Sequence, residues 1–499
     1  MKKPGIATHY QRYATSSILV LLAGMVSFPV LTRVLDNTQY GILGYYDTWV
    51  LMAVAIGKFG MQHSILRFYP HGGDEAKLRH FATNMFYLPL LMALALWLCA
   101  GAGLIAWDWL KGARQSTMLW LVLSMLPISI YCSLVDTVMR TTENSHTVTR
   151  TRVIGRWLEL ALMLGTVLLV AHTSVAAYSG KLVAAVLMLG FFVYWMTRRY
   201  TFSRPSVDLA TLRECLIYGL PLLVNEIIAV ALVSLDRLML KNLLGDFASV
   251  GIYTIGSSLA MQAGVFLNSA VFEAFIPTAN RLYVTEGEEA VRQLKSRLLL
   301  PLTYASIGAA ALLWCFGSDV IVALSGSGKA ASGPVFVLLG MVYALQPLLM
   351  VAGYGLLLEK RSVKVMLLMF GTFLVNAVLN LFWIPAHGVM GAVYATVVSS
   401  FALALAHCYF VPAALRRFPD GKTVLIAASV ALALSLAMHE LDAVMQWPHG
   451  WTRLLACGPA LGLAYMLACL GFDARLRAAV LGWLKSGPLG RLIPGGRQE

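Results

Sequence analysis

Long apolar segments separated by short polar connections make up most of the sequence. Fourteen of them are long enough to cross a bilayer, since a membrane helix needs about 20 residues, and none alternates strictly between apolar and polar positions as barrel strands do. The predicted spans are residues 13–35, 40–66, 81–107, 117–139, 153–171, 174–197, 214–235, 247–279, 298–316, 331–358, 365–384, 387–414, 423–441 and 454–472. This pattern predicts an all-α polytopic membrane protein with about fourteen transmembrane helices.

The charged residues add an orientation to these spans. Only 12% of the 499 residues are charged and 59% are hydrophobic, whereas a soluble domain has roughly a quarter and a half, so a soluble enzyme is excluded. Most of the 38 Lys and Arg residues, Lys58 and Lys295 among them, lie in alternate connections. The positive-inside rule therefore predicts that both termini are cytoplasmic. Topology also accounts for the net charge of +14, so no nucleic acid partner is expected.

Sequence motifs for catalysis or metal binding are missing. The seven Cys residues form no C-x-x-C pair and the ten His residues are scattered, so we predict no disulfide framework, metal site or cofactor. There is no G-x-S-x-G or Walker A motif. The longest outer connections, about 317–330 and 442–453, carry few polar groups. These features favour transport across the bilayer over an enzymatic reaction.

The two halves of the chain share landmarks in the same order. Span 1 ends around Arg33 and span 7 around Arg237, and each is followed by a Gly-Ile pair that opens the next span. Spans 4 and 10 each hold a central proline, Pro127 and Pro347. Such a repeat predicts two pseudo-symmetric lobes. The predicted parts are a six-helix lobe over 1–200, a second over 201–418, two additional helices over 419–473, and a loose, basic cytoplasmic tail over 474–499.

Three motifs link the chain to a known family. They are Phe28-Pro29-Val-Leu-Thr-Arg33, Ser234-Leu-Asp236-Arg237 with Gly251-Ile-Tyr253, and Asn376-Ala-Val-Leu-Asn380 with the following Ile384-Pro385. Together they resemble the polysaccharide transporter (Wzx-like) branch of the multidrug/oligosaccharidyl-lipid/polysaccharide (MOP) exporter superfamily. The resemblance implies a flippase of the bacterial inner membrane. It would move an undecaprenyl-pyrophosphate-linked oligosaccharide to the periplasmic leaflet by alternating access, for O-antigen, capsule or exopolysaccharide synthesis.

Five cations are candidates for binding the pyrophosphate or sugar of such a substrate. A charge at a span centre costs about 2.5–3.5 kcal/mol on insertion scales, so it usually faces a cavity or a partner. The candidates are Arg33, Arg67, Arg140, Arg156 and Lys181. Other interpretations stay open for each of them. Arg33 and Lys181 can reach the interface, Arg67 can anchor a headgroup, and Arg140 can pair with Asp136.

Six further residues are candidates for ion coupling or gating, with a proton or sodium gradient as the energy source. They are Asp47, Glu159, Glu226, Asp236, Arg237 and Glu273. Glu226 is the deepest acidic residue, and a lone glutamate there has to be protonated or paired. The alternatives are an Arg33 partner for Asp47, an Arg156 partner for Glu159, and a structural role for Asp236 and Arg237 in the turn between spans 7 and 8. Glu273 could pair with Arg281 or Arg297.

The candidate charges leave the first lobe positive and the second negative. This suggests that the first lobe holds the anionic headgroup and the second handles a cation. Membrane lipids and the polysaccharide polymerase and export machinery are expected partners. Three other functions remain open: a drug/cation antiporter of the same superfamily, a membrane-embedded glycan polymerase, and a non-transporting assembly partner.

Overall fold

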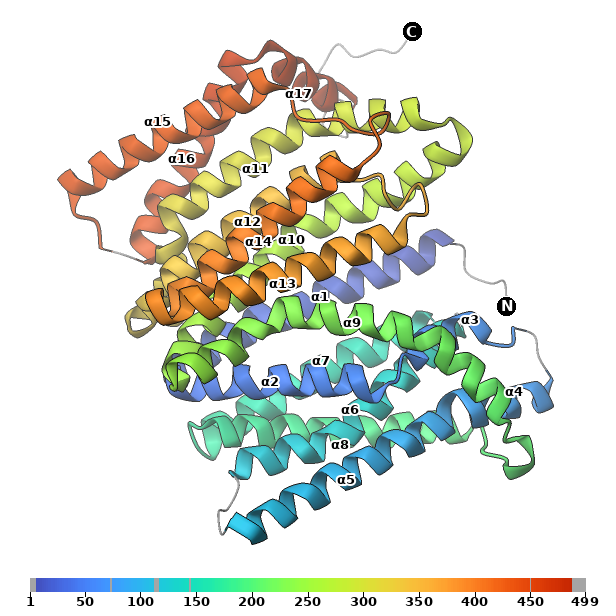
Figure 1. Ribbon diagram of the computed structural model, residues 1–499. Coiled ribbons are helices and arrows are strands. Elements are labelled where there is room, and N and C mark those ends of the chain that lie inside the picture. The colour runs from blue at the N-terminus through green and yellow to red at the C-terminus, as the bar shows by residue number, and fades with distance from the viewer. Residues whose placement is uncertain (1–5, 72–73, 112–115, 143–144, 449, 487–499) are drawn as a thin grey trace. The chain divides into compact units, whose positions relative to one another are not determined.

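The computed structural model describes residues 6–71, 74–111, 116–142, 145–448 and 450–486 (Figure 1). Within these ranges the chain is helical and its connections are short, so the prediction of an all-helical polytopic membrane protein is confirmed. The chain divides into two compact units, Met1–Thr254 and Ile255–Glu499. We refer to them as the first and the second unit. The two ends of the chain, on which the predicted orientation of the termini depends, lie outside the described residues.

The first unit contains the elements up to the start of α10. They are α1 (Ile6–Val34), α2 (Asn37–Gly57), α3 (Met61–Phe68), α4 (Glu75–Phe81), the π-helix η1 (Ala82–Tyr87), α5 (Leu88–Lys111), α6 (Thr117–Thr141), α7 (Ser145–Leu169), α8 (Ser174–Thr197), the short η2 (Arg204–Ser206) and α9 (Leu209–Leu244). Its core is formed by fully buried apolar side chains, among them Ile65, Phe86, Leu134 and Met196. This core packs α3, η1, α6 and α8 together.

The second unit contains the remaining elements. They are most of α10 (Phe247–Thr285), α11 (Glu288–Ser325), η3 (Ser327–Ser332), α12 (Gly333–Gly353), α13 (Ser362–His387), α14 (Val389–Phe410), α15 (Gly421–Met445), α16 (Trp451–Phe472) and α17 (Ala474–Ser486). Lys295 of α11 is fully buried here and donates hydrogen bonds to the carbonyl oxygens of Ala352, Tyr354 and Leu415. These hydrogen bonds join α11 to the end of α12 and to the connection that follows α14.

Eleven helices among the described residues are long and apolar enough to cross a membrane, and α2 with α3 makes a twelfth span bent by 47°. The other two predicted spans correspond to α1, whose apolar part Leu19–Val34 is shorter, and to α7, which begins with several charged residues. The total of fourteen therefore stays a prediction. Helices α10 and α11 are longer than predicted, with 39 and 38 residues.

The prediction of one unbroken helix over 40–66 is wrong, because the helix breaks between α2 and α3. Phe59 and Gly60 at the break have positive φ angles of 51° and 72°, a conformation that no right-handed helix accommodates. Glycine adopts it without the steric cost of a Cβ atom. A side chain at Gly60 would also have no room, because its Cβ would lie 2.2 Å from the carbonyl oxygen of Gly219 on α9.

The boundary of the first unit lies beyond α9, because α9 packs along α2 and α3. The repeat of six helices instead places the boundary between the lobes at residue 200. The first division describes which helices are packed together in this structure, and the second describes which helices correspond by sequence. The predicted lobes 1–200 and 201–418 therefore stay a prediction.

The last two long helices, α15 and α16, lie beside α11 in the second unit (Figure 1). One end of this helical pair is held by Arg453 of α16, which forms ion pairs with Asp319 of α11 and Asp442 of α15. The Arg453 and Asp319 side chains are almost completely buried, with 8% and 1% exposed. Because a buried charge is costly without a partner, this triad fixes the pair of helices on α11.

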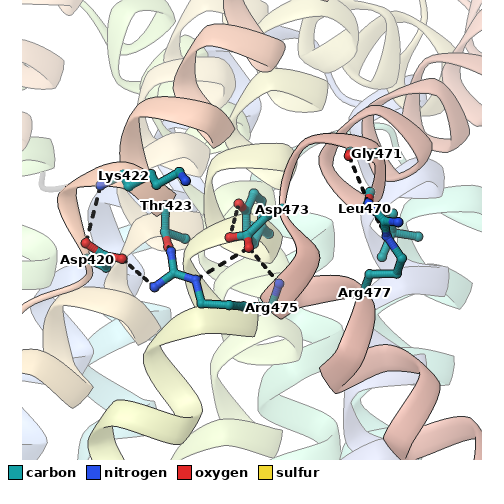
Figure 2. A network of polar contacts seen from close by, with 9 residues as sticks. Asp420, Lys422, Thr423, Leu470, Gly471, Asp473, Arg475 and Arg477 are labelled. Carbon is teal, nitrogen blue, oxygen red and sulfur yellow. Dashed lines mark hydrogen bonds and ion pairs between the residues drawn. The ribbon is translucent and has the colours of Figure 1, made fainter.

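The other end of the pair is held by a second polar network, shown in Figure 2. Asp473 accepts hydrogen bonds from Tyr304 of α11 and from the backbone N–H of Arg475, and the Arg475 guanidinium pairs with Asp420 at 2.6 Å. Asp473 thereby caps the start of α17. The predicted loose tail is wrong for Ala474–Ser486, which form this helix; residues 487–499 lie outside the described residues.

Candidate functional site

A cavity of about 400 Å³ in the first unit gathers five charged side chains of α6, α7 and α8. They are Asp136, Arg152, Arg156, Glu159 and Lys181. The rest of its wall is mainly apolar or small, as in Met125, Ile128 and Ala184. Three cations and two carboxylates therefore line one cavity whose remaining wall is mainly apolar.

Helix α7 contributes three of these charges because of their spacing. Arg152, Arg156 and Glu159 are separated by four and three positions, which places them on one face of a helix. Arg156 Nη1 donates a hydrogen bond of 3.0 Å to Glu159 Oε2. The two interpretations of Arg156 and Glu159 are thus compatible: the residues pair with each other, and they also line the cavity.

Lys181 of α8 enters the same cavity and pairs with Asp47 of α2. Its ammonium nitrogen lies 2.9 and 2.8 Å from the two carboxylate oxygens of Asp47. It also lies 5.3 Å from the ring centre of Tyr178, which provides a cation–π contact. Only 13% of the Lys181 side chain is exposed, so it does not reach out to the interface. Asp47 thus has Lys181 as a counter-ion, whereas the sequence offered Arg33 as one alternative.

The charges around the cavity do not all cancel. Asp136 pairs with Arg140, as the sequence suggested. Among the described residues, we find no ion pair or hydrogen bond of the Arg152 side chain, which is exposed. Arg152 therefore supplies positive charge that is available to an anion. Arg152 shares one face of α7 with Arg156 and Glu159 but is not among the predicted ligands, because a cation near a helix start resembles an ordinary interface residue.

Three predicted anion ligands, Arg33, Arg67 and Arg140, are not among the residues that line the cavity. Arg33 near the end of α1 is exposed. Arg67 at the end of α3 is also exposed, and its guanidinium lies 5.0 Å from the ring centre of Tyr218 and 5.8 Å from that of Phe68. The aromatic contacts hold Arg67 at the end of the bent span, where it can meet a lipid headgroup.

The predicted acidic residue Glu226 is paired. Lys58 Nζ lies 2.7 Å from Glu226 Oε1, and Gln62 Nε2 donates a hydrogen bond to Glu226 Oε2. Lys58 was grouped with the cytoplasmic cations by the topology argument, but it is buried at the end of α2. The sequence signal was the pair Gly57 and Gly60 around it, which is typical of a helix break.

The three remaining candidates, Asp236, Arg237 and Glu273, are not among the residues that line this cavity. Asp236 and Arg237 are buried within the first unit, and Asp236 accepts a hydrogen bond from the hydroxyl of Tyr253 on α10. This contact joins α9 to the following helix and agrees with a structural role in the turn between them. Glu273 is exposed on α10 in the second unit.

The described residues hold no group of three or more His, Cys, Asp or Glu side chains that could bind a metal ion. The second unit has a cavity of about 340 Å³ of a different kind, lined mainly by apolar residues of α10, α12, α13 and α14. Its polar groups are uncharged side chains such as Gln346 and Ser400, together with His407. Charge is therefore concentrated in the cavity of the first unit.

Solved structures of membrane transporters have the same fold. The lipid II flippase MurJ in an inward closed conformation is 12% identical and superposes with a TM-score of 0.70, covering 93% of this chain and 99% of MurJ. An inward-facing multidrug resistance MATE family transporter of the MOP superfamily is 15% identical with a TM-score of 0.54, covering 84% and 96%. For a MOP superfamily transporter from Pyrococcus furiosus the values are 13%, 0.52, 82% and 96%.

The sequence itself matches one family. The model of the family described as "Polysaccharide biosynthesis protein" matches residues 12–283, which is more than half of the chain. No curated protein sequence matches the chain. The family match and the fold agree with each other and with the three motifs described above. The chain therefore belongs to the polysaccharide biosynthesis protein family and has the same fold as transporters of the MOP superfamily.

Proposed function

We propose that the protein is a flippase that moves an undecaprenyl-pyrophosphate-linked oligosaccharide from the cytoplasmic to the periplasmic leaflet of the bacterial inner membrane. The observation that carries the proposal is the charged cavity of the first unit, which contains Arg152, Arg156 and Lys181. Family membership supports a role in polysaccharide synthesis. MurJ, a flippase of lipid II, is the precedent for a lipid-linked substrate in this fold.

The cavity suits a pyrophosphate because, among the described residues, one of its cations has no ionic partner and the other two are paired with carboxylates. Arg152 has no ionic partner among the described residues and can bind phosphate oxygens with two parallel hydrogen bonds. Arg156 and Lys181 are held by Glu159 and Asp47. An arriving pyrophosphate can replace these carboxylates, so the cavity would be preorganised in the empty protein and able to exchange partners on binding.

The test uses a deletion strain in which radiolabelled lipid-linked oligosaccharide is followed with a leaflet-specific probe. We expect the intermediate to accumulate in the inner leaflet and the surface glycan to be lost. The wild-type protein should reverse both effects, whereas Arg152→Ala and Arg156→Ala should not. Arg150→Ala is the matched control, because Arg150 is an exposed cation of the same helix that does not line the cavity.

Other outcomes would redirect the proposal. If the deletion, in a strain without a second flippase, leaves lipid-linked intermediates and surface glycan unchanged, the flippase function is wrong. A drug/cation antiporter is then the next candidate, since a MATE transporter has the same fold, and efflux of a lipophilic cation would test it. Retained polymerisation of glycan in the same strain would exclude the polymerase.

Energy coupling is part of the proposal. We infer that a proton or sodium gradient drives the cycle and that a membrane carboxylate carries the coupling ion. Of the acidic residues predicted for ion coupling, Glu159 is the one that lines the charged cavity, beside Arg156. Glu226 does not line that cavity and is paired with Lys58. Because its charge is already compensated by a lysine, we assign it to gating and not to ion transport. Replacement of Glu159 by Gln should abolish the response of transport to an imposed gradient while leaving substrate binding in place.

A further inference from the structure

Helix α9 packs against α2 and α3 along much of its length. The contact combines glycine residues, which let the backbones touch, with an ion pair. At the predicted outer end the backbones touch directly. A Cβ atom on Gly41 of α2 would lie 1.9 Å from the carbonyl oxygen of Phe247, and one on Gly251 would lie 1.8 Å from that of Asn37. Small residues allow such close approach of helices in membranes. We call this contact of α2 and α3 with α9 and the start of α10 the seam.

The predicted inner part of the seam is equally close. A Cβ atom on Gly60 would lie 2.2 Å from the carbonyl oxygen of Gly219, and one on Gly219 would lie 2.8 Å from that of Gly60. Next to this contact Ser64 Oγ donates a hydrogen bond of 2.7 Å to the carbonyl oxygen of Cys215. The seam is therefore closed at both of its ends by backbone contacts that leave no space for a substrate.

Between these two contacts the seam contains ionic groups. The Lys58 ammonium pairs with Glu226 at 2.7 Å, and Gln62 donates a hydrogen bond to the same carboxylate. The exposed fractions of the Lys58 and Glu226 side chains are 11% and 24%. Charges in such a place cost several kcal/mol unless they are paired. A permanent contact would be served as well by apolar residues, because a buried ion pair adds little net stability over a well-packed apolar pair.

We propose that Lys58, Gln62 and Glu226 form a charged latch that holds the seam closed and releases it during the transport cycle. The proposal rests on alternating access as part of the proposed function: α2 and α3 belong to the predicted lobe 1–200, and α9 to the predicted lobe 201–418. A partly separated ion pair leaves two uncompensated charges, which disfavours intermediate positions. The latch therefore gives the part of the seam that carries Lys58 and Glu226 two states, paired and separated.

Helix α9 has a feature that allows this opening. Pro221 lies between the inner contact at Gly219 and the latch residue Glu226. A proline inside a helix removes one backbone hydrogen bond and permits a bend. The part of α9 that carries Glu226 can therefore move away from Lys58 while the part beside Ser64 stays in contact. Lys58 and Gln62 are positioning residues in this device, because they act through the position of α9.

The first experiment locks the seam with a disulfide in full-length protein in membranes. A Cβ atom on Gly44 would lie 3.1 Å from Cβ of Thr254, close to the separation of about 3.8 Å in disulfides. The double variant Gly44→Cys with Thr254→Cys should cross-link on oxidation, lose flipping, and regain it after reduction. The single variants are the controls. If the oxidised double variant still transports as the reduced one does, the seam does not open and the proposal is wrong.

The second experiment measures the latch without any substrate. In the same double-cysteine background, Lys58→Met should lower the rate of cross-linking about tenfold, because the closed seam is less populated. Lys58→Glu with Glu226→Lys should restore the rate, which a merely misfolded protein would not do. Lys77→Met, at an exposed cation of α4, is the control. An unchanged rate in Lys58→Met would overturn the latch, whether or not the substrate has been identified correctly.

Discussion

Lys58 at the end of α2 donates a hydrogen bond of 2.7 Å to Glu226 of α9, a residue 168 positions further along the chain. Each of the two charges offsets the free-energy cost of burying the other. Gln62 lies four residues beyond Lys58, at the start of α3, and donates a hydrogen bond to the other oxygen of the same carboxylate. The pair joins the only strongly bent span of the described residues to the helix that begins the predicted second lobe.

A first prediction concerns the stability of this pair. Lys58→Met or Glu226→Gln alone should lower the free energy of unfolding by about 2 kcal/mol, since each leaves an unmatched polar group that is only partly reached by water. The double variant should cost less than the sum of the two, because it leaves no lone charge. Thermal unfolding in detergent would measure the coupling. Strict additivity would contradict a direct interaction.

A second prediction separates binding from stability in the charged cavity. Arg152→Ala should lower flipping at least about tenfold, the loss expected for one charge-assisted phosphate contact. Its unfolding free energy should change by less than about 0.5 kcal/mol, as for other exposed residues. Arg156→Ala should lower both flipping and stability, because it also leaves Glu159 without its partner. Transport assays and unfolding curves on the same preparations would check this, with Arg150→Ala as the reference.

A third prediction concerns the attachment of α15 and α16. Arg453→Ala should destabilise the protein by about 3–5 kcal/mol, because it removes the cation of a buried ion pair with Asp319. The guanidinium of the equally basic Arg477 is exposed and donates hydrogen bonds to the carbonyl oxygens of Leu470 and Gly471, so Arg477→Ala should have a small effect. Limited proteolysis of the connection after α14 would report detachment. Similar effects of the two substitutions would argue against the buried triad.

A fourth prediction is a dependence on pH at the other end of this helical pair. The hydrogen bond from Arg475 lowers the pKa of Asp420 from its ordinary 3.8. Burial by itself would raise the pKa of Asp473, but hydrogen bonds from the Arg475 N–H and from Tyr304, together with the Arg475 charge, outweigh it and lower the pKa. Groups with depressed pKa values stabilise the folded state above the ordinary value and lose that contribution as the pH falls through the lowered one.

The attachment of α17 should therefore be independent of pH from neutrality down to about pH 4 and weaken below it. Hydrogen exchange of Ala474–Ser486 between pH 3 and 7, corrected for the intrinsic exchange rate, would measure this. In Asp420→Asn the attachment should already be weaker at neutral pH and should change less on acidification. Weakening at pH 5 to 6 in the wild-type protein would show that other groups control the attachment.

Several features of the fold could be predicted from the sequence because they depend on local chemistry. Apolar segments of sufficient length indicated the membrane helices, and the motifs around Arg33, Asp236 and Asn376 indicated the family that the match to residues 12–283 establishes. The shared face of Arg152, Arg156 and Glu159 followed from helical spacing alone. The break between α2 and α3 was missed, although Gly57 and Gly60 flank it, because the positive φ angles at Phe59 and Gly60 go together with the packing of Gly60 against Gly219 of α9.

The tertiary structure decided which charges meet. The cost of a charge in the bilayer requires a partner or a cavity for Asp47, Glu226 and Arg453, and this much can be read from the sequence. It does not say which partner, because the candidates lie on different helices and any of several packings would satisfy the same requirement. Only the packing of α2 against α8 and α9 assigns Lys181 to Asp47 and Lys58 to Glu226, since ion pairs depend on separation in space and not on separation along the chain.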